Sequence, residues 1–124
     1  EVGDHVIRQV AQVLQRISRA SDVVARTGGE EYLLILPETD MNAARTLAER
    51  IRIAIGERPL LVDNQRIPIT VSLGVACTSG DVDLDELSQE ADRAMYLAKR
   101  GGRNRVASVE NKPIHLSSAA VATE

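Results

Sequence analysis

The stretch Asp22-Val-Val-Ala-Arg-Thr-Gly-Gly-Glu-Glu-Tyr-Leu-Leu-Ile-Leu36 decides the fold. Both of its ends are rich in apolar and β-branched residues, which favour strands. Gly28 and Gly29 stand between the two runs, and paired glycines are common in tight hairpin turns. The sequence therefore predicts a β-hairpin whose tip carries Glu30 and Glu31.

Apolar residues elsewhere recur at spacings that predict the other elements. Three segments place them three and four residues apart and are predicted to be amphipathic helices: 2–17, 40–56 and 83–100. A second hairpin is predicted from 60–62 and 67–76, and a short edge strand over 103–109. The order α-β-β-α-β-β-α-β predicts an α/β (α+β) fold, with a central, mostly antiparallel sheet flanked by helices. We expect one domain over 1–109 and, because 110–124 show no periodicity, a C-terminal tail or linker.

Composition and charge limit the function. The chain has 124 residues, of which 44% are hydrophobic, and this suits one globular domain. A net charge of -3 and an aromatic content of 2% argue against binding DNA or RNA, which requires a basic surface or stacking rings. No apolar run reaches the ~18 residues of a membrane span, no signal peptide is visible, and the single Cys77 forms no internal disulfide. We therefore expect a cytoplasmic segment that makes no membrane contact.

The tip of the first hairpin combines glycines with carboxylates. Adjacent residues on a strand point to opposite faces, so only one of Glu30 and Glu31 faces a given site. A carboxylate there suits Mg²⁺ bound to phosphates, and Gly28 and Gly29 let a nucleotide approach the backbone. An ordinary glycine hairpin with solvated glutamates is also open from these residues alone.

Two further clusters carry charged side chains. Lys99 and Arg103 lie four residues apart at the end of the last helix, where they suit one polyphosphate, although cations also favour a helix C-terminus. Arg19 and Asp22 precede the hairpin, and Arg50 lies on the following helix. An arginine with a neighbouring carboxylate can read the guanine edge or form an ordinary surface ion pair. The residues alone leave both interpretations of each cluster open.

A set of short segments carries a resemblance to a known family. They are Gly3-Asp4, Arg19-x-x-Asp22, Gly28-Gly29-Glu30-Glu31-Tyr32, Ile69-Thr-Val-Ser-Leu-Gly-Val-Ala76, Ala91-Asp-Arg-Ala-Met-Tyr-Leu-Ala-Lys99 and Gly102-Arg103-Asn104. Together they resemble GGDEF domains, the diguanylate cyclases that condense two GTP molecules into cyclic di-GMP and pyrophosphate. The resemblance covers about residues 1–107 and implies a nucleotidyl-cyclase, palm-like fold.

The resemblance also implies a role for each matching residue. Glu30 is expected to bind the catalytic metal, Mg²⁺ or Mn²⁺, and to help activate the attacking 3′-hydroxyl; Glu31 is expected to contribute to metal binding. The substrate-binding residues that it implies are Asp4, Gly28, Gly29, Lys99 and Arg103. Of these, the aspartate would bind the guanine edge, the glycines would lie against the nucleotide, and the two cations would neutralise the β- and γ-phosphates.

Assembly and regulation are implied in the same way. Each domain of the family holds one GTP, so catalysis requires an antiparallel homodimer. Arg19, Asp22 and Arg50 would form an inhibitory site that binds cyclic di-GMP and holds two domains in an unproductive geometry. An upstream sensory domain is expected in the parent chain, which is either free in the cytoplasm or tethered to a membrane. The alternative function is a non-catalytic cyclic di-GMP receptor that uses the same three residues, and a third is a purely structural or dimerising domain.

Two features depart from the pattern of the family. Tyr32 stands where phenylalanine is usual, and we expect little change from its hydroxyl. A complete domain begins with a strand and helix that carry another metal-binding aspartate and a guanine-binding asparagine, and this chain starts after both. That strand is central to the sheet, so its absence predicts unpaired strand edges and a fragment that does not fold normally alone. The missing strand would come from a preceding segment, an associated proteolytic piece or another chain. We expect little turnover from these residues by themselves.

Overall fold

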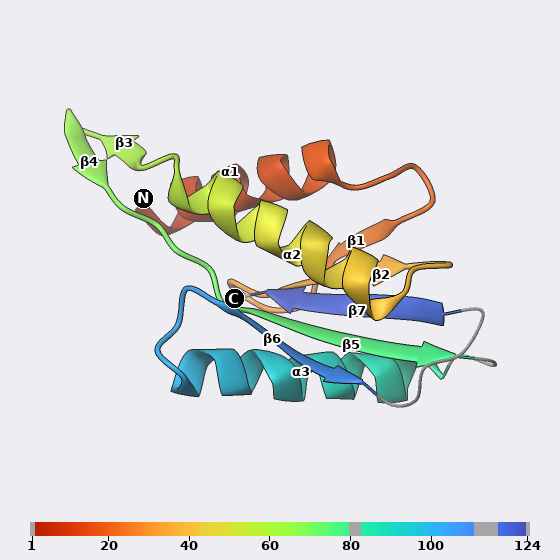
Figure 1. Cartoon of the computed structure of the whole chain (residues 1–124). Helices are drawn as coiled ribbons and strands as arrows, with labels where there is room; N and C mark the ends of the chain where they lie inside the picture. Colours follow the sequence, from red (N-terminus) through yellow and green to blue (C-terminus); the bar gives the residue numbers. More distant parts are fainter. Residues whose placement is uncertain (1, 80–82, 111–116, 124) are drawn as a thin grey trace.

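The computed structural model describes residues 2–79, 83–110 and 117–123. Each helix is followed along the chain by a group of two or three strands (Figure 1). The helices are α1 (Val2–Ile17), α2 (Met41–Gly56) and α3 (Leu84–Arg100). The strands are β1 (Val23–Arg26), β2 (Tyr32–Leu36), β3 (Leu60–Val62), β4 (Gln65–Ile67), β5 (Leu73–Ser79), β6 (Val106–Glu110) and β7 (Ser117–Thr123).

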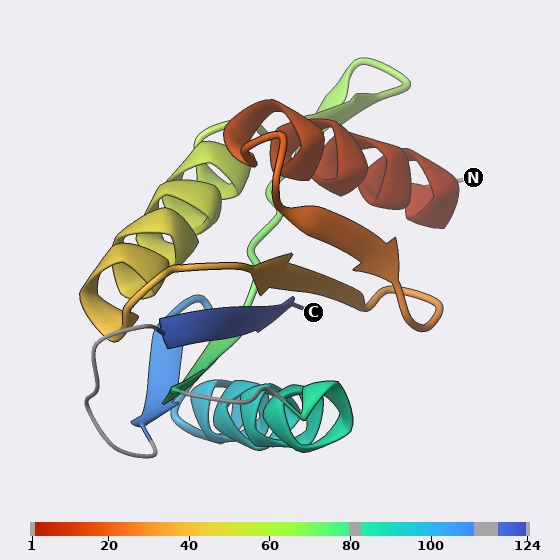
Figure 2. The same ribbon diagram turned by 90° about the vertical axis from the view of Figure 1, so that its right-hand side faces the viewer.

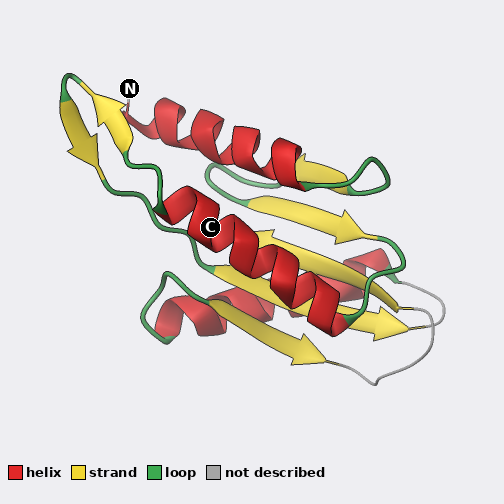
Figure 3. Ribbon diagram, turned by 45° about the horizontal axis from the view of Figure 1, so that its top comes forward, coloured by secondary structure: helices red, strands yellow, loops and turns green. Residues whose placement is uncertain are grey.

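A five-stranded sheet in the order β1-β2-β7-β5-β6 forms the centre of the molecule. The pairs β1–β2, β2–β7 and β5–β7 are antiparallel, and β5–β6 is parallel. Helices α1 and α2 cover one face of this sheet and α3 covers the other, as Figures 2 and 3 show. The predicted α+β class, with a mostly antiparallel sheet flanked by helices, is confirmed.

The first hairpin forms where the sequence predicts it. Strands β1 and β2 pair antiparallel, with Val23 opposite Ile35 and Arg26 opposite Tyr32. Side chains of β2 alternate between the faces of the sheet: Tyr32, Leu34 and Leu36 are buried in the core with α1 and α2, whereas the intervening Leu33 and Ile35 pack in the core with α3. This alternation fixes the register of the hairpin, because a slip of one residue would exchange the two faces.

Strand β7 occupies the middle of the sheet, so the expectation of a tail or linker over 110–124 was wrong for residues 117–123. It pairs along its whole length with β5 and over residues 119–123 with β2, and its residues from Ala119 to Thr123 are buried. A strand buried on both faces shows no alternation of polar and apolar residues, and small alanines have weak strand preference. The pattern used for prediction is therefore missing. The centre of the described sheet is continuous, which removes the reason to expect unpaired edges there.

The second predicted hairpin is shorter than expected. Strands β3 and β4 form a separate two-stranded sheet, joined by a turn in which Asp63 and Asn64 adopt φ angles of 51° and 65°. The expected strand over 67–76 divides after β4, and β5 begins only at Leu73. Pro68 lacks the amide hydrogen that a continuous strand would use.

No helix in the described part of the chain is long and apolar enough to cross a bilayer.

Candidate functional site

The tip of the β1–β2 hairpin is closed by a side chain of β1. Nε of Arg26 donates to the carbonyl oxygen of Gly28 at 3.1 Å, and its Nη2 donates to that of Gly29 at 2.7 Å. The backbone amide of Thr27 donates to the carbonyl of Glu31 at 2.9 Å. A Cβ built at Gly29 meets no other group within 4 Å. The tip is therefore held in shape from one side and remains open to a ligand at its second glycine.

Glu30 and Glu31 both precede β2, which begins at Tyr32, and their side chains have different surroundings. Glu30 lines a cavity whose wall includes residues of α1. The charge of Glu31 acts on Asp92 of α3, the helix on the other face of the sheet. Partial desolvation raises the pKa of Asp92, and the charge of Glu31 raises it further.

The cavity beside Glu30 has a volume of about 390 Å³ and is bounded by several separate elements. Its charged residues are Glu30 from the hairpin tip, Lys99 from the last turn of α3, and Arg103 from the loop that follows. Val6 and Val10 of α1 form an apolar part of its wall. A carboxylate and two cations around one cavity can hold a polyphosphate together with a divalent cation.

The end of α3 explains how both cations reach this cavity. Gly102 adopts a φ of 125° and Arg103 one of 62°, so the chain reverses direction directly after the helix. The amide of Arg103 donates to the carbonyl of Ala98 at 3.0 Å and fixes this reversal. A side chain at Gly102 would be strained by its φ and would meet the guanidinium of Arg105. Glycine at this position therefore lets Arg103 line the same cavity as Lys99.

Other predicted substrate and metal residues do not line this cavity. Asp4 is exposed in the first turn of α1, and Gly28, Gly29 and Glu31 are likewise outside the lining. Their predicted roles stay predictions. Thr123 of β7 does line the cavity, and sequence reasoning missed it because the segment that carries it was expected to be a tail.

The donor set of the cavity suits a metal that arrives with a nucleotide. The described residues contain no group of three or more His, Cys, Asp or Glu side chains placed to hold a metal ion. Among the described residues that line the cavity, Glu30 is the one that carries a carboxylate. Mg²⁺ is commonly bound by one or two carboxylates together with substrate phosphates, so Glu30 fits this mode of binding.

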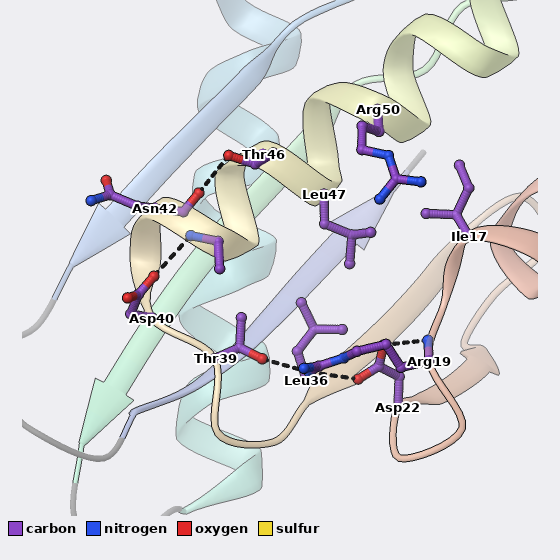
Figure 4. A pocket seen from close by; sticks show the side chains of 11 residues that line it. Ile17, Arg19, Asp22, Leu36, Thr39, Asp40, Asn42, Thr46, Leu47 and Arg50 are labelled. Atoms are coloured by element: carbon purple, nitrogen blue, oxygen red, sulfur yellow. Dashed lines mark hydrogen bonds and ion pairs between the residues drawn. The ribbon is translucent and has the colours of Figure 1, made fainter.

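A second cavity, of about 510 Å³, lies between α2 and the loops that flank β1 and β2 (Figure 4). It is lined by all three residues of the predicted inhibitory site: Arg19, Asp22 and Arg50. Arg50 reaches it from α2, and Ile17 and Leu47 provide an apolar part of its wall. The structure therefore brings together residues that are up to three elements apart in the sequence.

Arg19 is held rigidly at this second cavity. Its backbone amide donates to Oδ2 of Asp22 at 2.8 Å, and its Nη2 donates to Oδ1 of the same carboxylate at 3.1 Å. The same nitrogen donates to the Pro37 carbonyl at 3.1 Å and to Oγ1 of Thr39 at 2.7 Å. The Asp22 side chain is fully buried, whereas that of Arg19 is 57% exposed. The guanidinium is thus oriented by buried partners while one side stays accessible to a ligand.

Sequence reasoning missed the polar residues that complete this second cavity. They are Thr39, Asp40, Asn42 and Thr46, at and near the start of α2. Asp40 was predictable as a residue of the helix start, since its carboxylate accepts from the amide of Ala43 at 2.8 Å. The local sequence pattern does not predict that the start of α2 lies beside Arg19, because their proximity depends on how α2 packs on the sheet.

Comparisons with known proteins identify the family of this chain. The family model described as "Diguanylate cyclase, GGDEF domain" matches residues 1–105. Diguanylate cyclase A of Treponema denticola is 37% identical over 110 residues, which cover 88% of this chain and 30% of that protein. Diguanylate cyclase DgcM of Escherichia coli is 43% identical over 105 residues, covering 84% of this chain and 25% of that protein. The chain thus spans less than a third of the length of these two curated relatives.

Solved structures give the same result. The GGDEF domain of DgcB from Caulobacter crescentus, solved in complex with c-di-GMP, has a TM-score of 0.81 and 38% identity, with 86% of this chain and 64% of that one covered. The active GGEEF domain of a diguanylate cyclase from Vibrio cholerae has a TM-score of 0.70 and 29% identity, with 88% and 69% covered. The chain belongs to the GGDEF domain family of diguanylate cyclases.

Proposed function

We propose that this chain is the catalytic domain of a diguanylate cyclase, which condenses two GTP molecules into cyclic di-GMP and releases two pyrophosphates. The observation that carries this proposal is the cavity in which Glu30 of the hairpin tip meets Lys99 and Arg103 from the end of α3. A carboxylate beside two cations is the set of groups that a metal-bound triphosphate requires. The family match and the named relatives support the same reaction class.

The residues of the cavity divide the work between binding and proton transfer. Lys99 and Arg103 would neutralise the β- and γ-phosphates and orient the triphosphate. Glu30 would bind Mg²⁺ or Mn²⁺ and help to remove the proton of the attacking 3′-hydroxyl. When bound, the metal supplies charge stabilisation at the α-phosphate as the new P–O bond forms and the bond to pyrophosphate breaks. With a single carboxylate lining the described cavity, we expect slow turnover from these 124 residues by themselves.

The second cavity would regulate the first. Arg19 and Arg50 each present a guanidinium suited to guanine or phosphate, and Asp22 orients that of Arg19. Cyclic di-GMP bound there would hold two domains in an unproductive arrangement. Catalysis itself would take place between two antiparallel copies of the domain, because each copy holds one GTP. In the parent protein, an upstream sensory domain would control this pairing in the cytoplasm.

A pair of substitutions tests the separation of the two sites. Glu30→Ala should lower cyclic di-GMP synthesis about a hundredfold or more, because the metal ligand and proton acceptor is lost, and should leave cyclic di-GMP binding unchanged. Arg19→Ala should weaken cyclic di-GMP binding about tenfold or more and leave synthesis intact. Synthesis is measured by chromatography of the nucleotides with Mg²⁺, and binding by titration calorimetry. Glu57→Ala and Arg8→Ala serve as controls. Each removes a charge of the same sign as its site variant, at an exposed position outside both cavities. Loss of cyclic di-GMP binding in both site variants would refute the assignment of the sites.

A non-catalytic cyclic di-GMP receptor is the second candidate. The specific observation in its favour is that the larger cavity contains Arg19 in a fixed orientation, with Asp22 and Arg50 beside it. A receptor would bind cyclic di-GMP in calorimetry while GTP survives with Mg²⁺ at every protein concentration. The presence of Glu30, Lys99 and Arg103 at a shared cavity favours the enzyme, because a receptor has no use for them.

A further inference from the structure

Thr123 has a buried hydroxyl that the fold itself does not use. The residue is 1% exposed, and its Oγ1 has no hydrogen-bond partner among the residues that the structure describes. Buried hydroxyls are normally hydrogen-bonded, since an unpartnered one has lost its bonds to water without replacement. Valine has nearly the same shape and would fill the position without this cost. Packing therefore accounts for the size of the side chain but not for its hydroxyl.

The backbone of β7 places Thr123 among the residues that line the catalytic cavity. Thr123 is paired with Tyr32 of β2 and with Leu73 of β5, so its position is fixed from both sides. It lies on the same face of β7 as Val121, the face that carries α1, and it lines the cavity that contains Glu30 and both cations. Figures 1 and 2 show the end of β7 close to the turn between β1 and β2.

We propose that the hydroxyl of Thr123 donates a hydrogen bond to the phosphate chain of the GTP bound in this cavity, a proposal that rests on the proposed function. A threonine O–H can rotate to meet an acceptor, and an anionic phosphate oxygen is a stronger acceptor than any neutral group. Lys99 and Arg103 line the same cavity and would hold the phosphates there. Thr123 is thus a positioning residue for substrate, supplied by the strand that completes the sheet.

Binding of 3′-deoxy-GTP with Mg²⁺ tests this proposal, because the analogue lacks the attacking hydroxyl and is not consumed. The dissociation constant is measured by titration calorimetry on the full chain and on three variants. Thr123→Val should weaken binding about tenfold, the loss of a hydrogen bond to a charged group, and Thr123→Ser should restore it to within about threefold. Thr78→Val removes a threonine hydroxyl near the opposite end of neighbouring β5 and should bind as the wild type does.

Thermal melting of the same variants separates a ligand contact from a structural role. Thr123→Val should melt at the same temperature as the wild type or higher, since it removes an unpartnered buried hydroxyl. A lower melting temperature would mean that the hydroxyl stabilises the fold, which would overturn the proposal. Unchanged affinity in Thr123→Val would overturn it too, while leaving the proposed function in place. Failure of the wild-type chain to bind 3′-deoxy-GTP would instead refute the proposed function, and the role of Thr123 with it.

Discussion

Shortening Val121 to alanine tests whether β7 lies at the centre of the sheet. Val121 is fully buried and is paired with Leu34 on one side and Val75 on the other. Removing its methyl groups loses about 1.6 kcal/mol of transfer free energy, at ~0.8 kcal/mol per carbon. The cavity that remains between two fixed strands adds to this, so the free energy of unfolding should fall by about 2 to 3 kcal/mol.

Urea unfolding followed by circular dichroism measures this change, with Val23→Ala as the matched control. Val23 lies on the edge strand β1 and is 55% exposed, so the same substitution there should change the free energy of unfolding by less than about 0.5 kcal/mol. The dependence on urea should be the same in both variants, because neither alters the surface exposed on unfolding. If Val121→Ala is as mild as Val23→Ala, residues 117–123 are not a central strand in solution and the reasoning fails.

Three further predictions follow from single contacts. Gly74→Ala should destabilise the chain by about 3 kcal/mol in urea unfolding, because a Cβ there overlaps the backbone of α3 at Met95; a mild effect would mean that α3 lies farther from β5. Asp92→Asn should stabilise the fold near neutral pH, where partial desolvation and the charge of Glu31 oppose ionisation and raise the pKa of Asp92. Because the raised pKa destabilises only the ionised form of the folded state, the gain in stability should vanish as the pH falls toward about 3. A gain in stability that grows on acidification would contradict this prediction. Tyr32→Phe should cost about 1 kcal/mol in the same assay, because the hydroxyl donates to a carbonyl of α1 at 3.0 Å; equal stability would show that this bond contributes nothing.

Local patterns predicted the elements whose signals lie within a few residues. The hairpin around Gly28 and Gly29 is confirmed because strand-forming residues and turn glycines act over short distances. The helices are confirmed for the same reason, and Asp40 and Asp83 each accept a hydrogen bond from the first turn of the helix that follows. That only one of Glu30 and Glu31 lines the cavity was also predictable, since adjacent residues of an extended chain point to opposite sides.

Strand β7 could not be predicted in this way. Ser117–Thr123 consists of small residues, so neither its composition nor its alternation distinguishes it from a linker. Its place in the sheet is decided by long-range pairing with β2 and β5, which no local pattern contains. The contribution of Thr123 to the cavity was missed as a direct consequence.

The two cavities show the same limit. Sequence reasoning identified Arg19, Asp22 and Arg50 as one site through a resemblance, and the structure brings all three to one cavity. It did not identify Thr39, whose hydroxyl accepts from Arg19 at 2.7 Å, because that contact depends on the packing of the loop before α2. Charged residues at motif positions were therefore found, while the neutral residues that orient them were not.

Conversion of GTP by this chain with Mg²⁺, followed by chromatography, is the most direct test of its assignment as a diguanylate cyclase domain. The mass of the chain is confirmed first, and Glu30→Ala is assayed beside it. We expect slow formation of cyclic di-GMP that rises more steeply than linearly with protein concentration, because two copies must meet, and that disappears in Glu30→Ala. Folded wild-type chain that leaves GTP intact at every concentration, or equal product from Glu30→Ala, would contradict the account.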